Sequence, residues 1–179
     1  MNKSGKIEIK ANGPNGECYF FDYMWSITED RCTVEIRYQR GTAGLPRDTE
    51  VLKWAANYDG SVDIGEGDRR VHEVFRGIGL GSLAMWVLVT WAKKRAGEVS
   101  VATILLSAEH AATASARDRR NRFWEKLGFT FDYHDDKSWG QSRPMTTASL
   151  VVPQFTLACG WQLEEIEPPT GESHSIAVG

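Results

Sequence analysis

The clearest pattern in the chain is a run of apolar residues at helical spacing between residues 79 and 96. The apolar positions recur at i, i+3, i+4, i+7, i+8 and i+11, and they are Leu80, Leu83, Ala84, Val87, Leu88 and Trp91. This spacing places them along one face of a helix. Basic residues at 93–95 suit the negative end of the helix dipole, and Gly97 can end the helix. The pattern predicts a helix over 79–96.

A second apolar set in this segment, Met85, Trp86 and Val89, lies off that stripe. A helix that is apolar on more than one side has to be covered on more than one side. The sequence leaves two candidates for the cover, the N-terminal segment of the same chain and a second subunit. The second candidate predicts a homodimer.

The first forty residues alternate between apolar and polar positions, as half-buried strands do. The segments that carry this pattern, or are dense in aromatic and β-branched residues, are Lys6–Lys10, Cys18–Thr28 and Thr33–Tyr38. Turn residues at 12–16 and at Glu29-Asp30 separate them. The N-terminal part is therefore predicted to be β-rich, and residues 49–56 fit either a short helix or another strand.

Residues 61–133 alternate between strand and helix patterns. The predicted order is a strand over 61–74, the helix over 79–96, a strand over 101–106, a helix over 118–127 and a strand over 130–133. This order is typical of an α/β core. Farther along the chain, Thr147–Val152 and Ala158–Glu165 fit a last pair of strands.

The composition fits one domain with a sizeable core, because 41% of the 179 residues are hydrophobic. Acidic residues from Glu164 onward predict a domain over 1–167 and a flexible tail over 168–179. The formal net charge of −3 argues against a protein that binds nucleic acid through an overall basic surface.

The cysteines and the apolar runs bear on the compartment. The 3 cysteines are far apart and lack CxxC spacing, which predicts free thiols rather than a zinc site or a disulfide framework. No other metal site is predicted. The first ten residues hold no apolar run, and the longest apolar stretch, Leu83–Val89, is too short to span a bilayer. We expect a cytoplasmic protein without a membrane partner.

A glycine-rich turn lies between the predicted strand at 61–74 and the helix at 79–96. Arg76, Gly79 and Gly81 form an Arg-x-x-Gly-x-Gly pattern there. Backbone N–H groups in such a turn, at the start of a helix, favour an anion such as a pyrophosphate. The spacing matches neither the dinucleotide-binding pattern nor the kinase-type P-loop. Three glycines also suit a tight turn with close packing and no ligand.

A second motif makes the interpretation of this turn more specific. Residues 73–81 read Glu-Val-Phe-Arg-Gly-Ile-Gly-Leu-Gly, and residues 121–129, about forty positions later, read Asn-Arg-Phe-Trp-Glu-Lys-Leu-Gly-Phe. Together they resemble the acetyl-CoA motif and the Phe-Tyr-Glu-Lys-Leu-Gly-Phe motif of the GCN5-related N-acetyltransferase family. The resemblance covers residues 61–133. It is weak over 1–60, where the family usually has two helices after its first strand.

The resemblance implies an α/β fold with a mixed, splayed β-sheet flanked by helices, the acyl-CoA N-acyltransferase fold, here with an atypical β-rich N-terminal part. In the family, the pantetheine arm of acetyl-CoA lies between two splayed strands, which here would end near Val71 and Ser107. The backbone of Arg69, Arg70 and Val71 would pair with this arm. The N–H groups that would hold the pyrophosphate belong to Gly77, Ile78, Gly79, Leu80, Gly81 and Ser82.

Basic side chains near this site have several interpretations. Arg76 fits either a solvated cation or a direct phosphate contact. The run 117–122 carries four arginines, and it fits a solvated helix face, a contact of Arg117 or Arg120 with a phosphate of CoA, or a contact with RNA. No aromatic residues of the kind that stack on RNA bases are interleaved with the run, which favours the first two interpretations.

The family's chemistry is the transfer of an acetyl group to a primary amine by direct attack on the thioester. It needs a base for the amine, a polarised carbonyl and an acid for the leaving thiolate. The preferred base candidates, Glu109 and His110, follow the strand at 101–107. Further candidates near the other splayed strand are His72, Glu73 and Glu66.

This chain departs from the family pattern at the position of the acid. Trp124 occupies the position of the usual tyrosine, and Arg117 occupies that of an asparagine seven residues earlier. An indole N–H donates a hydrogen bond but no proton at neutral pH. Trp124 therefore either donates to the sulfur or packs beside the cofactor. Tyr133 and Tyr23 are the replacement candidates for the acid.

Two hypotheses follow. The first is an acetyl-CoA-dependent N-acetyltransferase whose acceptor is a small molecule, a peptide amine or an aminoacyl group on a tRNA. The second is a module that binds acetyl-CoA and a partner protein without turnover, which Trp124 and the unusual N-terminal half motivate.

Overall fold

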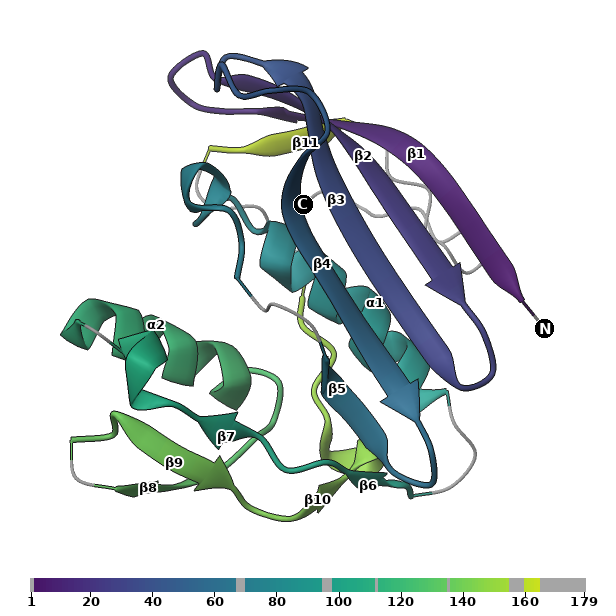
Figure 1. Cartoon of the computed structure of the whole chain (residues 1–179), viewed down its shortest axis with the longest axis vertical. Coiled ribbons are helices and arrows are strands. Elements are labelled where there is room, and N and C mark those ends of the chain that lie inside the picture. The colour runs from purple at the N-terminus through teal and green to yellow at the C-terminus, as the bar shows by residue number, and fades with distance from the viewer. Residues whose placement is uncertain are drawn as a thin grey trace.

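The computed structural model describes residues 2–66, 70–94, 98–111, 113–134, 136–154 and 160–164. Within them the chain forms a mixed α/β structure with two β-sheets and two α-helices (Figure 1). The predicted site residue Arg69, the thiol of Cys159 and the predicted tail 168–179 lie outside the described residues. The side chains of Glu66 and His110 lie outside them as well. No helix in the described part is long and apolar enough to cross a membrane.

The larger sheet has 8 strands and contains the whole N-terminal third of the chain. In spatial order they are β10 (Met145–Thr146), β6 (Ser100–Val101), β5 (Val62–Glu66), β4 (Thr49–Tyr58), β3 (Arg31–Gly41), β2 (Cys18–Ile27), β1 (Lys3–Asn12) and β11 (Gln162–Glu164). The neighbours β1 to β5 are antiparallel, and only β5 and β6 pair in parallel. The predicted β-rich N-terminal part is confirmed, and residues 49–56 belong to a strand.

One face of the larger sheet is apolar and buried because the strands alternate as the sequence predicts. In β3, for example, Cys32, Val34 and Ile36 are fully buried at every second position. Helix α1 (Leu80–Lys93) packs on this face against β3, β4 and β5. The helix predicted over 79–96 is thus confirmed over 80–93.

The opposite face of the larger sheet carries many polar residues, and several of its charged side chains form pairs. Lys6 Nζ lies 2.7 Å from Asp22 Oδ2, and Arg40 Nη1 donates to Glu8 Oε2 at 2.7 Å. Each pair joins side chains of neighbouring or nearby strands on the solvent side of the sheet. This face therefore needs no covering element.

The smaller sheet has 3 strands in the order β7 (Leu105–Leu106), β9 (Trp139–Ser142) and β8 (Phe131–His134). Helix α2 (Ala114–Glu125) connects β7 to β8. It begins four residues earlier than predicted because Thr113 is its N-cap, whose side chain accepts from the N–H of Ala116 at 3.1 Å.

The two sheets are joined where β5 and β6 pair and then part. Their pairing is confined to Val62 and Val101, with the Ala102 N–H donating to the Val62 carbonyl at 2.8 Å. Two residues farther on, the Ile104 N–H donates to Ser142 Oγ, and the Ile104 carbonyl accepts from the Ser142 N–H, both at 2.9 Å. The chain therefore leaves β5 for β9, and the strand predicted over 101–106 is two short strands in different sheets.

The last predicted strand pair is wrong. Thr147–Ser149 form a short 3-10 helix, η3, and residues 150–154 lie in no strand. Lys93 holds this turn, because its ammonium group donates to the carbonyl of Ala148 at 2.9 Å and to that of Leu150 at 2.7 Å. The second predicted strand is present as β11, but it pairs with β1.

The second apolar set of α1 is covered within the chain. Met85 is 1% exposed and Val89 is 0% exposed, while Trp86 is partly buried against the core. Met85 and Val89 are therefore covered without a second subunit, and the homodimer stays a prediction.

Candidate functional site

The predicted phosphate loop follows the 3-10 helix η1 (Glu73–Phe75) and leads into α1. Phe75 anchors it to the larger sheet, since its fully buried ring lies 5.2 Å from the ring of Phe21 and 5.5 Å from that of Tyr38, between centroids. Upstream, the N–H of His72 donates to the Val51 carbonyl of β4 at 2.8 Å. The loop is thus held from both sides by β2, β3 and β4.

The glycines of the loop have different physical reasons to be glycine. Gly77 has φ 86° and Gly79 has φ 112°, conformations that side chains with a Cβ rarely adopt. At Gly81 the reason is packing, because a Cβ there would lie 2.9 Å from Cη2 of Trp54. No atom lies within 4 Å of the place where a Cβ of Gly77 would be, so that side of the loop is open.

The backbone of the loop presents free donors. Within the described part of the chain, none of the N–H groups of Gly77–Ser82 donates a hydrogen bond, and the first N–H of the helix with a partner is that of Leu83, which donates to the Gly79 carbonyl at 3.1 Å. A helix leaves its first N–H groups free in any case. Here the free donors begin three residues before the helix, which extends the cradle for an anion.

Arg76 closes the turn from the side. Its Nε donates to the carbonyl of Val71 at 3.0 Å, and its side chain is exposed. The terminal nitrogens of Arg76 have no partner among the described residues. The bond to Val71 shapes the turn. The terminal nitrogens still face solvent, so Arg76 can be a solvated cation or contact a phosphate directly.

No family model, curated protein or solved structure matches this chain. The assignment of the site therefore depends on the chain's own residues and their geometry.

Helix α2 lies on the same side of the sheets as α1, and Trp54 shows this directly. Trp54 is 3% exposed on β4 and packs against Gly81 at the start of α1. Its ring also meets the ring of Phe123 on α2 edge-on, with centroids 5.9 Å apart. Trp54 was missed by the sequence analysis, since nothing local distinguishes it from the other core residues of β4.

Trp124, predicted near the cofactor, is a packing residue. It is 4% exposed, and its ring contacts those of Phe123 and Phe129 edge-on at 5.2 Å and 5.5 Å between centroids. Burial in this aromatic cluster agrees with the packing part of the second role considered from the sequence, and its position beside a cofactor stays a prediction.

The basic run of α2 divides into anchored and exposed arginines. Arg120 holds the end of β7, because Nη1 donates to the Ser107 carbonyl at 2.5 Å and Nη2 donates to the Ser138 carbonyl at 3.0 Å. Burial lowers the pKa of Arg120. Arg117, predicted to bind the cofactor, donates to Asp136 Oδ2 at 2.7 Å. Both side chains are engaged in structural contacts.

Tyr133, a candidate acid, lies on β8, and β9 separates it from β7. Its hydroxyl donates to Glu125 Oε1 at 2.8 Å. Burial and this bond to a carboxylate raise the pKa of Tyr133 above its usual value. A phenol with a raised pKa that already donates its proton to Glu125 is poorly suited to act as an acid, and it lies two strands away from β7.

The other candidates differ in what the structure shows. Glu109 is exposed in the 3-10 helix η2 (Ala108–Ala111), directly after β7, so it lies where the sequence placed it. The backbone of His110 follows it there. Nδ1 of His72 is buried beside Phe75 and has no hydrogen-bond partner in the part of the chain that the structure describes. Tyr23 is fully buried, and burial raises its pKa, so it is not available to a ligand.

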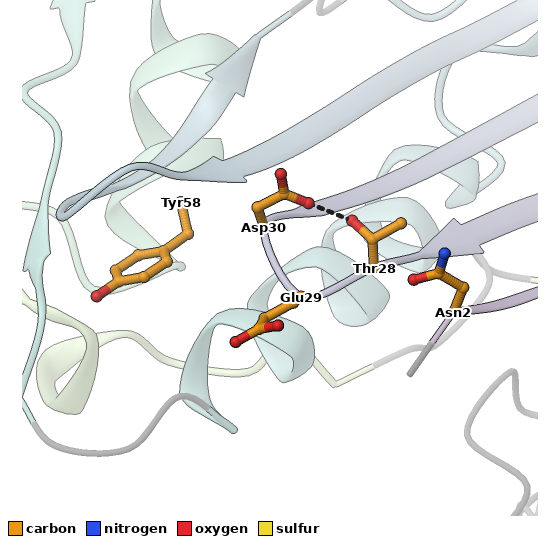
Figure 2. A pocket seen from close by; sticks show the side chains of 5 residues that line it. All are labelled: Asn2, Thr28, Glu29, Asp30 and Tyr58. Atoms are coloured by element: carbon orange, nitrogen blue, oxygen red, sulfur yellow. Dashed lines mark hydrogen bonds between the residues drawn. The ribbon is translucent and has the colours of Figure 1, made fainter.

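A hollow elsewhere on the molecule is lined by Asn2, Thr28, Glu29, Asp30 and Tyr58 (Figure 2). Within it, Thr28 donates to Asp30 Oδ1 at 2.6 Å. The indole of Trp91, near the end of α1, donates to the Thr28 carbonyl at 3.2 Å. The hollow therefore lies at the opposite end of α1 from the loop, about 20 Å away along the helix.

Among the described residues, no group of three or more His, Cys, Asp or Glu side chains is placed to hold a metal ion.

Proposed function

We propose that the chain has the acyl-CoA N-acyltransferase fold and transfers an acetyl group from acetyl-CoA to a primary amine in the cytoplasm. The observation that carries the proposal is the loop Gly77–Ser82 at the start of α1, whose N–H groups have no hydrogen-bond partner among the described residues. It lies between β5 and α1, in the order strand, loop and helix that the family uses.

The parting of β5 and β6 supports the same proposal. These two parallel strands pair only at Val62 and Val101, and after β6 the chain leaves β5 and enters the smaller sheet as β7. A pantetheine arm carries amide groups that pair with such strand edges as another strand would. On this proposal, the backbone of Arg70 and Val71 borders the arm on one side, and β7 borders it on the other.

The proposed reaction needs little from side chains. The amine nitrogen attacks the thioester carbonyl, the carbon–sulfur bond breaks, and coenzyme A leaves as a thiolate. The amine proton passes through a base to solvent, and Glu109 is the proposed base because it is exposed directly after β7. On this proposal, backbone N–H groups of the loop stabilise the charge of the pyrophosphate by hydrogen bonds and fix its position.

A second candidate function is a module that binds acetyl-CoA without transferring its acetyl group. The observation that favours it is the environment of the two acid candidates. Trp124 is buried among phenylalanines, and the proton of Tyr133 is engaged by Glu125. Measuring acetyl transfer to a panel of small amines, peptides and aminoacyl-tRNA separates the two functions, since only the enzyme releases free CoA in step with acetylated product.

Ser82, the third residue of α1, offers a test of the loop itself. A carboxylate at this position interacts favourably with the helix N-terminus, so Ser82→Glu should fold at least as stably as the wild type. The same carboxylate repels a pyrophosphate. We expect Ser82→Glu to weaken acetyl-CoA binding at least tenfold by titration calorimetry.

Ser82→Gln is the matched control, because it adds the same volume without the charge. We expect its affinity for acetyl-CoA to stay within about threefold of the wild type. Equal affinities for the Glu and Gln variants would show that no phosphate lies at the start of α1. Absence of acetyl-CoA binding to the wild type would reject both candidate functions.

A further inference from the structure

The smaller sheet has one covered face and one open face. Tyr133 and Phe131 of β8 point toward α2, as the bond from Tyr133 to Glu125 shows. Side chains alternate along a strand, so their neighbours point the other way. The residues on that open face are Leu105, Asp132, His134, Trp139 and Gln141, and all of them are exposed.

Two of these residues form an apolar patch. Leu105 is 72% exposed and Trp139 is 45% exposed. Leu105 pairs with Gln141, two positions along β9 from Trp139, so the two apolar side chains are diagonal neighbours within reach of each other. The imidazole of His134 stacks on Trp139, with centroids 3.7 Å apart and planes at 9°, and it supports one side of the indole.

Polar groups border the patch. Asp132 accepts from Arg143 Nε at 2.8 Å, and Gln141 lies between Asp132 and Leu105. An apolar centre with a polar border is typical of a binding surface rather than of plain solvent-exposed sheet. The solvent-facing side of the larger sheet differs from this face, because charged pairs such as Lys6–Asp22 and Arg40–Glu8 lie on it.

The patch lies near the strand gap, which is the place where the chain leaves β5 after β6 and continues into β7. Leu105 belongs to β7, the edge strand of the smaller sheet, which follows directly from the point where the chain leaves β5. Because α1 and α2 lie on one side of the sheets, the phosphate loop at the start of α1 lies on that side too. A ligand that extends from the loop toward the place where the chain leaves β5 would therefore leave the sheet face away from α1 and α2 uncovered.

We propose that this open face of β7 and β9 binds the acceptor, and that the acceptor amine is carried on a flat apolar group such as an aromatic ring. The proposal depends on the proposed acetyl transfer and names its substrate class. Leu105 and Trp139 contact the ring, and the amine lies toward the gap and Glu109. Two side chains cover one ring, whereas a stable protein partner needs an interface of about 1,000 Å² or more.

The experiment compares two amines that differ only in a phenyl ring, 2-phenylethylamine and ethylamine. Their binding to the full chain is measured by calorimetry, with and without CoA, in the wild type and in Leu105→Ser. The control is Val151→Ser, since Val151 is 51% exposed and belongs to neither sheet. Leu105 is so exposed that its replacement should leave the fold intact, which thermal unfolding verifies.

We expect 2-phenylethylamine to bind at least tenfold more tightly than ethylamine, and Leu105→Ser to remove most of that difference. The control variant should retain it, and acetyl-CoA should bind equally to all three proteins. Equal binding of the two amines, or an unchanged preference in Leu105→Ser, would overturn the proposal. A wild-type dimer that Leu105→Ser dissociates would also overturn it, because the patch would then join two copies.

The failures of the two proposals are distinguishable. A chain that binds 2-phenylethylamine through Leu105 but does not bind acetyl-CoA rejects the proposed function and the acceptor role, and retains the aromatic amine site. A chain that binds acetyl-CoA with no preference for the aromatic amine rejects only the acceptor class.

Discussion

The glycines of the proposed phosphate loop serve the backbone turn at two positions and packing at a third. Gly77 and Gly79 provide the left-handed turn, whereas Gly81 provides room for Trp54. The sequence motif predicted the turn because glycine is the residue that adopts such conformations. It did not predict the contact with Trp54, because that residue comes from a strand 27 positions earlier in the chain.

Gly81→Ala tests the packing role. A methyl group 2.9 Å from the Trp54 ring should cost about 1–3 kcal/mol of folding free energy. In a Trp54→Leu background the clash is relieved, so the same change should cost clearly less. Urea unfolding of the four proteins of this cycle measures the coupling.

Gly77→Ala is the matched control for that cycle. Its cost comes from φ 86° alone, about 1–2 kcal/mol, and should be the same in both backgrounds. If Gly81→Ala costs as much without the indole as with it, Trp54 is not the reason for this glycine.

Tyr133 predicts a dependence of stability on alkaline pH. Its pKa is raised in the folded chain by burial and by Glu125, while in the unfolded chain it is about 10. Above pH 10 the unfolded state loses a proton that the folded state keeps, so stability falls as pH rises toward the folded pKa. The slope contributed by one such group is at most about 1.4 kcal/mol per pH unit.

The Tyr133→Phe variant should lack this part of the alkaline slope, as guanidine unfolding between pH 9 and 11 would measure. Tyr23 contributes a slope of the same sign, which remains in the variant. Identical alkaline slopes in the wild type and in Tyr133→Phe would contradict the assignment. If the chain is an enzyme, we expect the turnover of the variant to stay within about threefold of the wild type.

At the scale of elements, the helices and strands with a strong local pattern of apolar residues could be predicted from the sequence. The stripe on α1 and the alternation in β2 and β3 are properties of neighbouring residues, so the sequence alone indicates them. The strand over 101–106 failed because Ile104 bonds to Ser142, a partner 38 positions away. The strand over 147–152 failed for a similar reason, since Lys93 of α1 holds its backbone carbonyls in a turn.

Arg120 connects helix α2 to the end of β7 by hydrogen bonds. Arg120 donates to the carbonyls of Ser107 and Ser138, so its removal takes one donor from each of these acceptors. We expect Arg120→Ala to lower the free energy of unfolding by about 1–3 kcal/mol. Arg119, exposed on the same helix and without a partner in the described part, is the control, and its replacement should cost less than about 0.5 kcal/mol. Equal costs for the two variants in urea unfolding would contradict the structural role of Arg120.

At the scale of the whole molecule, the feature that matters most for the proposed function is the place where the chain leaves β5 after β6. The sequence predicted a mixed α/β structure, and the structure confirms that much. The order of the strands depends on pairings such as Val62 with Val101, which no local pattern specifies. The order of motifs along the chain indicated the candidate loop, but only the fold shows which side of the sheets it faces.

The most direct test of the central claim is the response of the backbone amides to acetyl-CoA. In an isotope-labelled chain, the largest nitrogen and proton chemical-shift changes should fall on the N–H groups of Gly77–Ser82, which have no partner among the described residues, with further changes along Arg70 and Val71. The Ser82→Glu variant should lose these changes at the same ligand concentration. Changes concentrated elsewhere, with the amides of Gly77–Ser82 unmoved at saturation, would contradict the account.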